Sequence, residues 1–310
     1  MTAQSPAIKD LPVMGFFFSA FLSFLFGANA IAIKISLTGL GTFSTAGIRF
    51  GIAAITILVW ALATHQPIAI RKGQIHQLAI LSMIFFVQLS LFYAGLNKTY
   101  ASRGTLLANM QPFFVLILAH FFIPGDQITR KKLVGMLLAF AGVAFVLLQR
   151  QGVSSELKTG DLIVLGAAFL WACNGVYTKR VLVGLQPYQV VLYPMMIASP
   201  LLFAEAWLAG ETLPLQTDTR VVLSVMYQAF VTASFGFVAW NTMLKKYGAV
   251  AMHSFIFIMP VAGVLLGNVM LGEPITLNLL VALCLIVTGI VIVNVRTKKE
   301  VVIVHPGRNV

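Results

Sequence analysis

The chain consists of long apolar runs separated by short polar segments. A hydrocarbon core of about 30 Å is crossed by about 20 helical residues at a rise of about 1.5 Å each. The runs are continuous and do not alternate, which favours helices over the strands of a membrane barrel. We therefore predict ten transmembrane helices, at residues 13–35, 44–63, 77–97, 101–122, 132–149, 161–182, 187–208, 220–243, 249–271 and 277–295.

The composition agrees with a chain that is solvated mainly by lipid. Hydrophobic residues make up 59% of the 310 residues and charged residues only 10%, whereas about 25% is usual in soluble domains. The net charge of +12 would suggest a nucleic-acid partner in a soluble protein. Here the basic residues fall in short segments between apolar runs, where they set topology and contact anionic lipids. The bilayer is the expected partner, and nucleic acid is not.

One motif occurs twice. Residues 26–34 read FGANAIAIK and residues 171–179 read WACNGVYTK, so an aromatic residue, an Asn and a Lys recur at the same spacing. Pro112 and Pro260 correspond in the same way. Each copy of the repeat contains five predicted helices. Because five is odd, the second copy enters the membrane from the opposite side, which predicts an all-α membrane protein built from two inverted-topology five-helix repeats.

The boundaries and the orientation follow from the polar segments. With the N-terminus inside, 14 of the 21 Lys and Arg residues fall on the cytoplasmic side and 7 outside, which favours cytoplasmic termini in a multi-pass protein of the cell (inner) membrane. The predicted parts are a cytoplasmic N-terminus at 1–12, a first repeat at 13–149, a link at 150–160, a second repeat at 161–295 and a cytoplasmic tail at 296–310.

Several short motifs, in this order and spacing, resemble the EamA-like branch of the drug/metabolite transporter superfamily. They are Phe26-Gly27-Ala28-Asn29 followed by Lys34, Arg49-Phe50, Gly160-Asp161-Leu162, Trp171-Ala172, and Pro260 followed by Leu271-Gly272-Glu273-Pro274-Ile275-Thr276. Two positions depart from the family pattern: Phe26 replaces its usual Trp, and Gly125-Asp126-Gln127 replaces its Gly-Glu-Arg-like turn. The resemblance implies a ten-helix carrier with a central cavity. Members of this family move amino acids, nucleosides, drugs and other small metabolites, often outward.

Polar residues within the apolar runs are the candidates for a solute site. A polar side chain in the bilayer is costly unless it is partnered, so it tends to face the bundle interior. In the fourth run Thr105, Asn109 and Pro112 share a helix face, and His253 in the ninth run occupies the repeat position of Thr105. The predicted substrate-binding residues are Asn29, Tyr93, Asn97, Asn109, Trp171, Asn174, Tyr227, Trp240 and His253.

Several polar residues also have a structural alternative. Asn29 and Asn174 could bind solute or could clamp neighbouring helices through hydrogen bonds. Trp240 could belong to the interfacial aromatic belt, and His120 could meet lipid headgroups. Glu273 is expected either to cap the start of the tenth helix or to lie in solvent.

No acidic residue is placed near the middle of a predicted span, which argues against a carrier for cations. Coupling to a proton or another ion could involve a His, which titrates near neutral pH. No motif for catalysis, a metal, a cofactor or ATP is present. The favoured hypothesis is a secondary transporter, not an enzyme, that moves a small neutral or zwitterionic metabolite, with an amino acid and export preferred. The alternatives are a multidrug or nucleoside carrier of the same fold and, from other classes, a membrane-embedded transferase or a channel.

Overall fold

The structure is a computed structural model in which the described part of the chain is helical and contains no strand. It describes residues 13–122, 130–148, 154–182, 184–212, 218–243, 246, 255–256 and 258–294. The helices are α1 (Val13–Ser36), α2 (Thr42–Ala63), α3 (Lys72–Lys98), α4 (Ala101–Ala108), α5 (Gln111–Phe122), α6 (Arg130–Leu148), α7 (Ser155–Val181), α8 (Gln189–Leu208), α9 (Thr219–Met226), η1 (Tyr227–Gly236), α11 (Ile258–Leu271) and α12 (Leu277–Asn294).

Length and apolar composition mark six helical segments of the described chain as able to cross a membrane: α1, α2, α3, α7, α8 and Thr219–Met243. α11 and α12 are shorter apolar helices. Large apolar side chains such as Phe17, Trp207 and Val269 are exposed on the outside of the bundle. An apolar exterior is expected where the surrounding solvent is lipid, so the chain is a multi-pass membrane protein.

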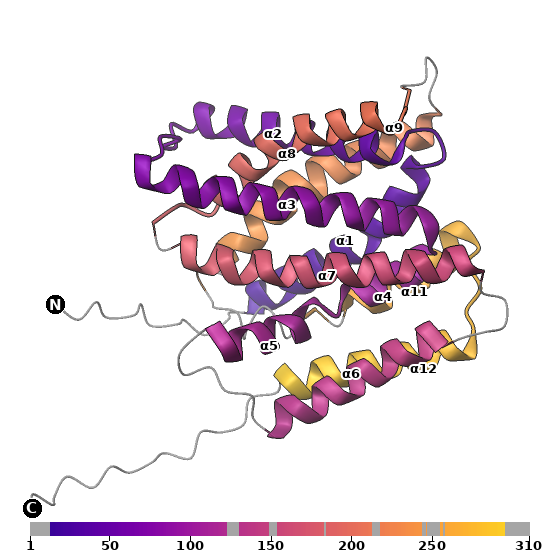
Figure 1. Ribbon diagram of the computed structural model, residues 1–310. Helices are drawn as coiled ribbons and strands as arrows, with labels where there is room; N and C mark the ends of the chain where they lie inside the picture. The colour runs from indigo at the N-terminus through magenta and orange to yellow at the C-terminus, as the bar shows by residue number, and fades with distance from the viewer. Residues whose placement is uncertain are drawn as a thin grey trace, which may run out of the picture.

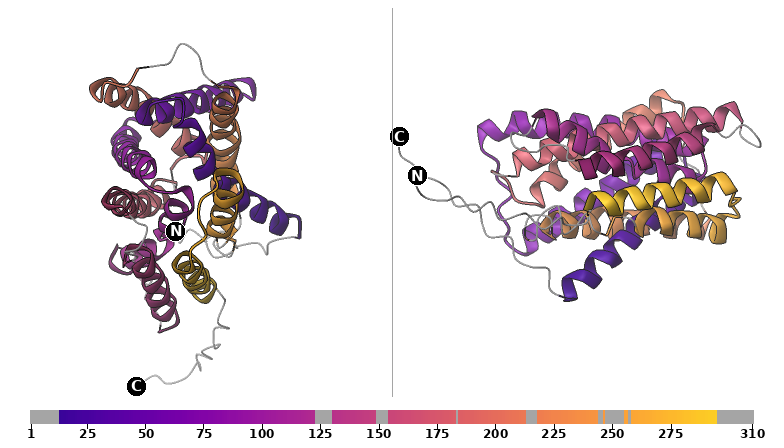
Figure 2. Two further views of the ribbon diagram at one scale, coloured as in Figure 1. Left: turned by 90° about the vertical axis from the view of Figure 1, so that its right-hand side faces the viewer. Right: turned by 90° about the horizontal axis from the view of Figure 1, so that it is seen from below.

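Most helices lie side by side with their axes roughly along one direction, and α1 runs obliquely across them (Figure 1). α2 packs beside α8, α3 beside α7, and α1 beside α11. α6 and α12 form a pair at one edge of the bundle, and the end-on view in Figure 2 shows this pair beside the remaining helices. The N-terminal and C-terminal halves of the chain are therefore interleaved through several helix pairs.

Small residues bring α6 and α12 into close contact. A Cβ atom added to Gly289 would lie 2.5 Å from the carbonyl oxygen of Gly135. A Cβ atom added to Gly142 would lie 2.9 Å from the carbonyl oxygen of Ala282. Close backbone approach through small residues is the usual means of packing helices in lipid, because burial of apolar area drives little association there.

Two of the predicted spans are not single α-helices. The fourth is broken after Ala108, where Asn109 ends α4 and α5 begins at Gln111. The eighth changes from α-helix to π-helix over η1 and returns to α-helix after Gly236. Periodicity alone does not reveal a π-helix, so the apolar pattern did not predict this change of helix type. Tyr227 donates a hydrogen bond to Leu25 O in α1, and Ser234 Oγ lies 2.7 Å from Ala229 O within η1 and 3.5 Å from Ala53 O in α2.

Carboxylates from the C-terminal half cap two helices of the N-terminal half. Glu211 accepts hydrogen bonds from the backbone N–H groups of Phe43 and Ser44 at the start of α2. Glu273 accepts from the N–H groups of Ala101 and Ser102 at the start of α4 and is 5% exposed. The prediction that Glu273 caps the tenth helix or lies in solvent is therefore wrong. A carboxylate at a helix N-terminus satisfies free donors and complements the helix dipole.

Candidate functional site

A buried arginine is at the centre of a polar cluster that joins the two halves of the chain. Arg49 lies seven residues after the start of α2, about 10 Å along the helix axis at about 1.5 Å per residue, and is 3% exposed. Its Nη1 donates to Tyr93 Oη at 3.1 Å, and its Nη2 donates to Thr232 Oγ1 at 3.1 Å. The guanidinium also lies 4.6 Å from the ring centroid of Phe50.

Gln228 of η1 extends this cluster toward α1. Its Oε1 accepts a hydrogen bond from Tyr93 Oη at 3.1 Å. Its Nε2 donates to Ser36 Oγ at 2.6 Å and lies 3.1 Å from the carbonyl oxygen of Ala32. The amide of Gln228 is fully buried, and both its oxygen and its nitrogen have hydrogen-bond partners. Because an unpaired amide group inside the bundle would be costly, these bonds fix the distance between the helices that they join.

Thr232 links the arginine to one of the two repeated asparagines. Its Oγ1 lies 3.0 Å from Asn29 Oδ1 and 2.8 Å from Gln228 O, and it accepts from Arg49. One hydroxyl proton can be donated to only one of the two oxygens at a time. Asn29 is half-buried, so it is the part of this cluster that remains partly accessible. We name Asn29, Arg49, Tyr93, Gln228 and Thr232 the central polar cluster.

The π-helix η1 contributes two members of the cluster. Gln228 and Thr232 are four residues apart and both fully buried. π-helical turns are rare and occur frequently at functional sites. The presence of the π-helix η1 at this position is therefore a second indication that the central polar cluster is a functional site.

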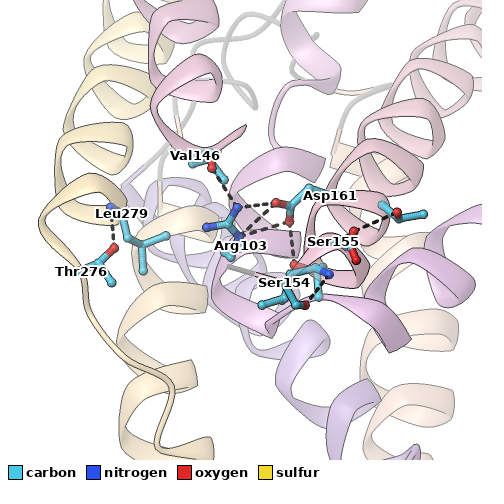
Figure 3. A network of polar contacts seen from close by, with 10 residues as sticks. Arg103, Val146, Ser154, Ser155, Asp161, Thr276 and Leu279 are labelled. Carbon is cyan, nitrogen blue, oxygen red and sulfur yellow. Dashed lines mark hydrogen bonds and ion pairs between the residues drawn. The ribbon is translucent and has the colours of Figure 1, made fainter. Parts of the chain in front are cut away.

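A second buried cation is paired within the protein. Arg103 of α4 forms an ion pair with Asp161 of α7, and its Nη2 donates to Val146 O of α6 at 2.8 Å (Figure 3). Thr99 Oγ1 donates to the other oxygen of Asp161 at 2.6 Å. This arrangement connects three helices and supplies the counter-ion of each charge, so its chemistry is that of a structural clamp.

The structure places the predicted residues of the N-terminal half in different surroundings. Asn29 and Tyr93 belong to the central polar cluster. Asn109 is buried, and its Nδ2 donates to Thr105 O within the same helix. Asn97 is exposed near the end of α3, where its carbonyl oxygen accepts from Lys34 Nζ at 3.4 Å.

The predicted residues of the C-terminal half also lie in different surroundings. Tyr227 is half-buried against α1. The ring of Trp171 lies 5.8 Å from that of Phe92, and the ring of Trp240 lies 5.8 Å from that of Phe26. His253 lies outside the described residues.

The two repeated asparagines differ in their contacts. Asn29 accepts a hydrogen bond across helices, whereas Asn174 accepts one from Thr178 on its own helix. The buried Nδ2 of Asn174 has no hydrogen-bond partner in the described part of the chain. Asn29 therefore has the contact expected of a clamp, and Asn174 has a free donor on a half-buried side chain.

Arg49, Gln228 and Thr232 were not among the predicted site residues. The 7 basic residues counted on the outer side include Arg49 and Arg103, and that placement is wrong because both are buried within helices. The signal was available in the sequence, since a charged residue inside an apolar run marks a functional site by default. Without these two residues, 5 basic residues remain on the outer side against 14 on the cytoplasmic side, so the difference in basic residues between the two sides is larger.

No group of three or more His, Cys, Asp or Glu residues in the described segments is arranged to hold a metal ion. The chemistry available at the central polar cluster is hydrogen bonding from one cation, two hydroxyls and two amides.

Comparison with known proteins establishes the family. The EamA-like transporter family model matches residues 13–148 and again residues 158–295. The chain belongs to this family, which confirms the resemblance predicted from its motifs.

Individual relatives agree with this assignment. The chain is 25% identical over 279 residues to a protein of Escherichia coli (strain K12) named "Probable amino-acid metabolite efflux pump", covering 86% of this chain and 90% of that one. It is 27% identical over 275 residues to the "Uncharacterized transporter YyaM" of Bacillus subtilis (strain 168), covering 85% and 88%. A solved crystal structure of a protein with 19% identity superposes with a TM-score of 0.66, covering 89% of this chain and 94% of that one, and supports the fold.

Proposed function

We propose that the protein is a secondary transporter that moves a small neutral or zwitterionic metabolite, preferably an amino acid and preferably outward, by alternating access. The observation that carries this proposal is the central polar cluster, in which Arg49 and Tyr93 of the N-terminal half bond to Gln228 and Thr232 of the C-terminal half inside an apolar bundle. A polar site between two halves that can move against each other is what alternating access requires.

The helix pairing supports two inverted repeats of five helices. The repeat relates α2 to α8 and α6 to α12, and each of these pairs packs together, as equivalent helices beside a two-fold axis would. The small-residue contacts of α6 and α12 support the same relation, because the repeat places Gly135 at Ala282 and Gly142 at Gly289, and both cross-contacts are present. The family model also matches twice, once in each half.

The proposed arrangement has ten spans, with α4 and α5 forming the fourth and Thr219–Met243 the eighth. The repeats lie at 13–149 and 161–295, and both termini lie on the cytoplasmic side of the inner membrane. The unequal distribution of Lys and Arg supports this orientation. An amino-acid substrate and export are supported by the name of the Escherichia coli relative.

Two other readings have weaker support. A nucleoside or multidrug carrier would use the same fold, and the half-buried rings of Trp171 and Trp240 would suit a flat solute. A transferase or channel would need a catalytic cluster or an open pore, and the buried, mutually bonded cluster around Arg49 offers neither. A proton or another ion remains a candidate for coupling.

Counterflow in proteoliposomes tests the proposal. Vesicles containing the purified protein are loaded with an unlabelled amino acid, nucleoside or quaternary ammonium drug, and entry of the labelled solute is measured. Saturable entry that depends on internal solute supports a carrier, and the solute that gives it identifies the class. Flux that is linear with concentration and indifferent to internal solute would refute it.

A further inference from the structure

Arg49 carries a positive charge that the described residues do not neutralise. Six carboxylates lie in the described part of the chain, and each contacts a partner other than Arg49: Glu156, Asp161, Glu205, Glu211, Asp218 and Glu273. The hydrogen-bond partners of Arg49 are the neutral oxygens of Tyr93 and Thr232. Arginine is almost never this deeply buried without an anion, because desolvation of a charge is costly.

The guanidinium also has an unused donor. Nε of Arg49 is buried and has no hydrogen-bond partner in the ranges that the structure describes. Arginine presents its N–H groups in a planar fork that matches the two oxygens of a carboxylate. Among the described residues, the Arg49 guanidinium thus has neither an anion to balance its charge nor an acceptor for its Nε–H. A carboxylate would supply both.

Arg103 provides the internal comparison. It is also buried in a helix of the N-terminal half, but Asp161 faces it and Nε donates to both carboxylate oxygens, at 3.1 and 3.3 Å. Within the described residues, the protein therefore supplies a carboxylate to one buried arginine and none to the other. The repeat places Pro194 at the position of Arg49, so the second half adds no matching charge.

We propose that Arg49 is the binding residue for a carboxylate group of the transported solute. This inference rests on the proposed transport function and specifies which part of the solute the site recognises. Tyr93 and Thr232 hold the guanidinium in place, and in the absence of solute they occupy the N–H groups that the carboxylate would take.

The location of these bonds links recognition to movement. Arg49 contacts Thr232 across the boundary between the halves, and Tyr93 contacts Gln228 across the same boundary. A carboxylate that takes the N–H groups of Arg49 replaces a contact between halves with a contact to solute. Binding of a carboxylate therefore weakens the bonds that hold the two halves together at η1. The movement that exposes the site to the other side of the membrane then depends on a carboxylate.

The test compares acids with their amides, which keep the size and the amino group but lose the anion. In counterflow assays with the full-length protein, L-leucine, L-phenylalanine and L-threonine are each compared with L-leucinamide, L-phenylalaninamide and L-threoninamide as competitors. For the wild type we expect every amide to compete about 100-fold more weakly than its acid, since hydrogen bonds between charged groups are at stake. Equal competition by acid and amide in the wild type overturns the proposal without any variant having to fold.

Variants assign the effect to the arginine. Arg49→Gln is expected to reduce the preference for acid over amide to less than about fivefold, and Arg49→Lys to leave an intermediate preference because the charge remains without the fork. The matched control carries Arg103→Gln together with Asp161→Asn, which removes the other buried cation with its counter-ion and should keep the wild-type preference. An undiminished preference in Arg49→Gln overturns the assignment.

The same assay separates the two proposals. If a nucleoside without a carboxylate shows saturable counterflow and no acid competes, the carrier function stands and the role of Arg49 is refuted. If no solute in either panel shows counterflow, the transport function fails, and the inference that rests on it fails as well.

Discussion

Thr232 Oγ1 lies 3.1 Å from Arg49 Nη2, so a hydroxyl of the C-terminal half holds a buried cation of the N-terminal half. The two residues are separated by 183 positions in the chain. Their contact joins η1 to α2, and the other members of the central polar cluster bond to one of these two residues or to Tyr93. Perturbing this contact should alter transport before it alters folding.

Thr232→Val should lower the rate of exchange by about tenfold, because the isosteric methyl group cannot accept from Arg49 or bond to Asn29. Thr232→Ser keeps the hydroxyl and should retain most of the activity. The measurement is counterflow in proteoliposomes, with competition by acids and amides as the second readout. A variant that unfolds would lose both together, whereas a positioning role predicts a changed acid preference in folded protein. Equal activity of the Val and Ser variants would contradict this role.

Asp161→Asn should destabilise the protein by about 3–5 kcal/mol, because it leaves Arg103 buried without a counter-ion. The free energy of unfolding is read from denaturant titration in mixed micelles. The control is Glu156→Gln, which breaks the solvent-exposed contact between Glu156 and Lys98 at 3.9 Å and should cost less than about 1 kcal/mol. Similar losses for the two variants would show that the buried pair contributes no more than a surface pair.

Gly289→Ala should lower stability by about 1–3 kcal/mol, because the added methyl group would meet the Gly135 carbonyl oxygen at 2.5 Å. The backbone of α6 would have to move away from α12. Gly166→Ala is the matched control, since a Cβ atom there has nothing within 4 Å, and the helix propensity of alanine should make it neutral or slightly stabilising. Thermal unfolding of both purified variants gives the comparison, and a stable Gly289→Ala protein would mean that α6 and α12 are not packed this closely.

Asn174→Ala should reduce transport with little loss of stability, because the amide's Nδ2 donor has no partner within the described structure. Its remaining bond, to Thr178, lies within α7. Leu170→Ala, one turn earlier on the same helix, is the control for packing. Equal loss of transport in both variants would indicate that Asn174 acts only through packing.

The apolar pattern predicts the helices well and their irregularities poorly. Runs of apolar residues are imposed by the thickness of the bilayer, so α1, α2, α3, α7 and α8 lie close to where they were expected. The break at Asn109 and the π-helix from Tyr227 to Gly236 depend on contacts with other helices. Local periodicity contains no information about those contacts, so the π-helix was not predicted from the sequence.

The site was predicted in part for a similar reason. Asn29 and Tyr93 were found because polar residues in apolar runs tend to face the interior. Arg49 was missed because a basic residue near the start of a run was read as a topology signal. Gln228 and Thr232 were not singled out from sequence, and their importance comes from Arg49, which lies on a different helix. The bonds between halves could not be read from either half alone.

The central claim is that the two halves alternate around a closed site, and transient overshoot tests it most directly. Vesicles are loaded with a high concentration of unlabelled solute, and labelled solute at low concentration is added outside. A carrier predicts that the label rises above its equilibrium level and then falls as the internal pool is lost, with the overshoot reduced in Thr232→Val. A monotonic approach to equilibrium, unaffected by the internal solute, would contradict alternating access.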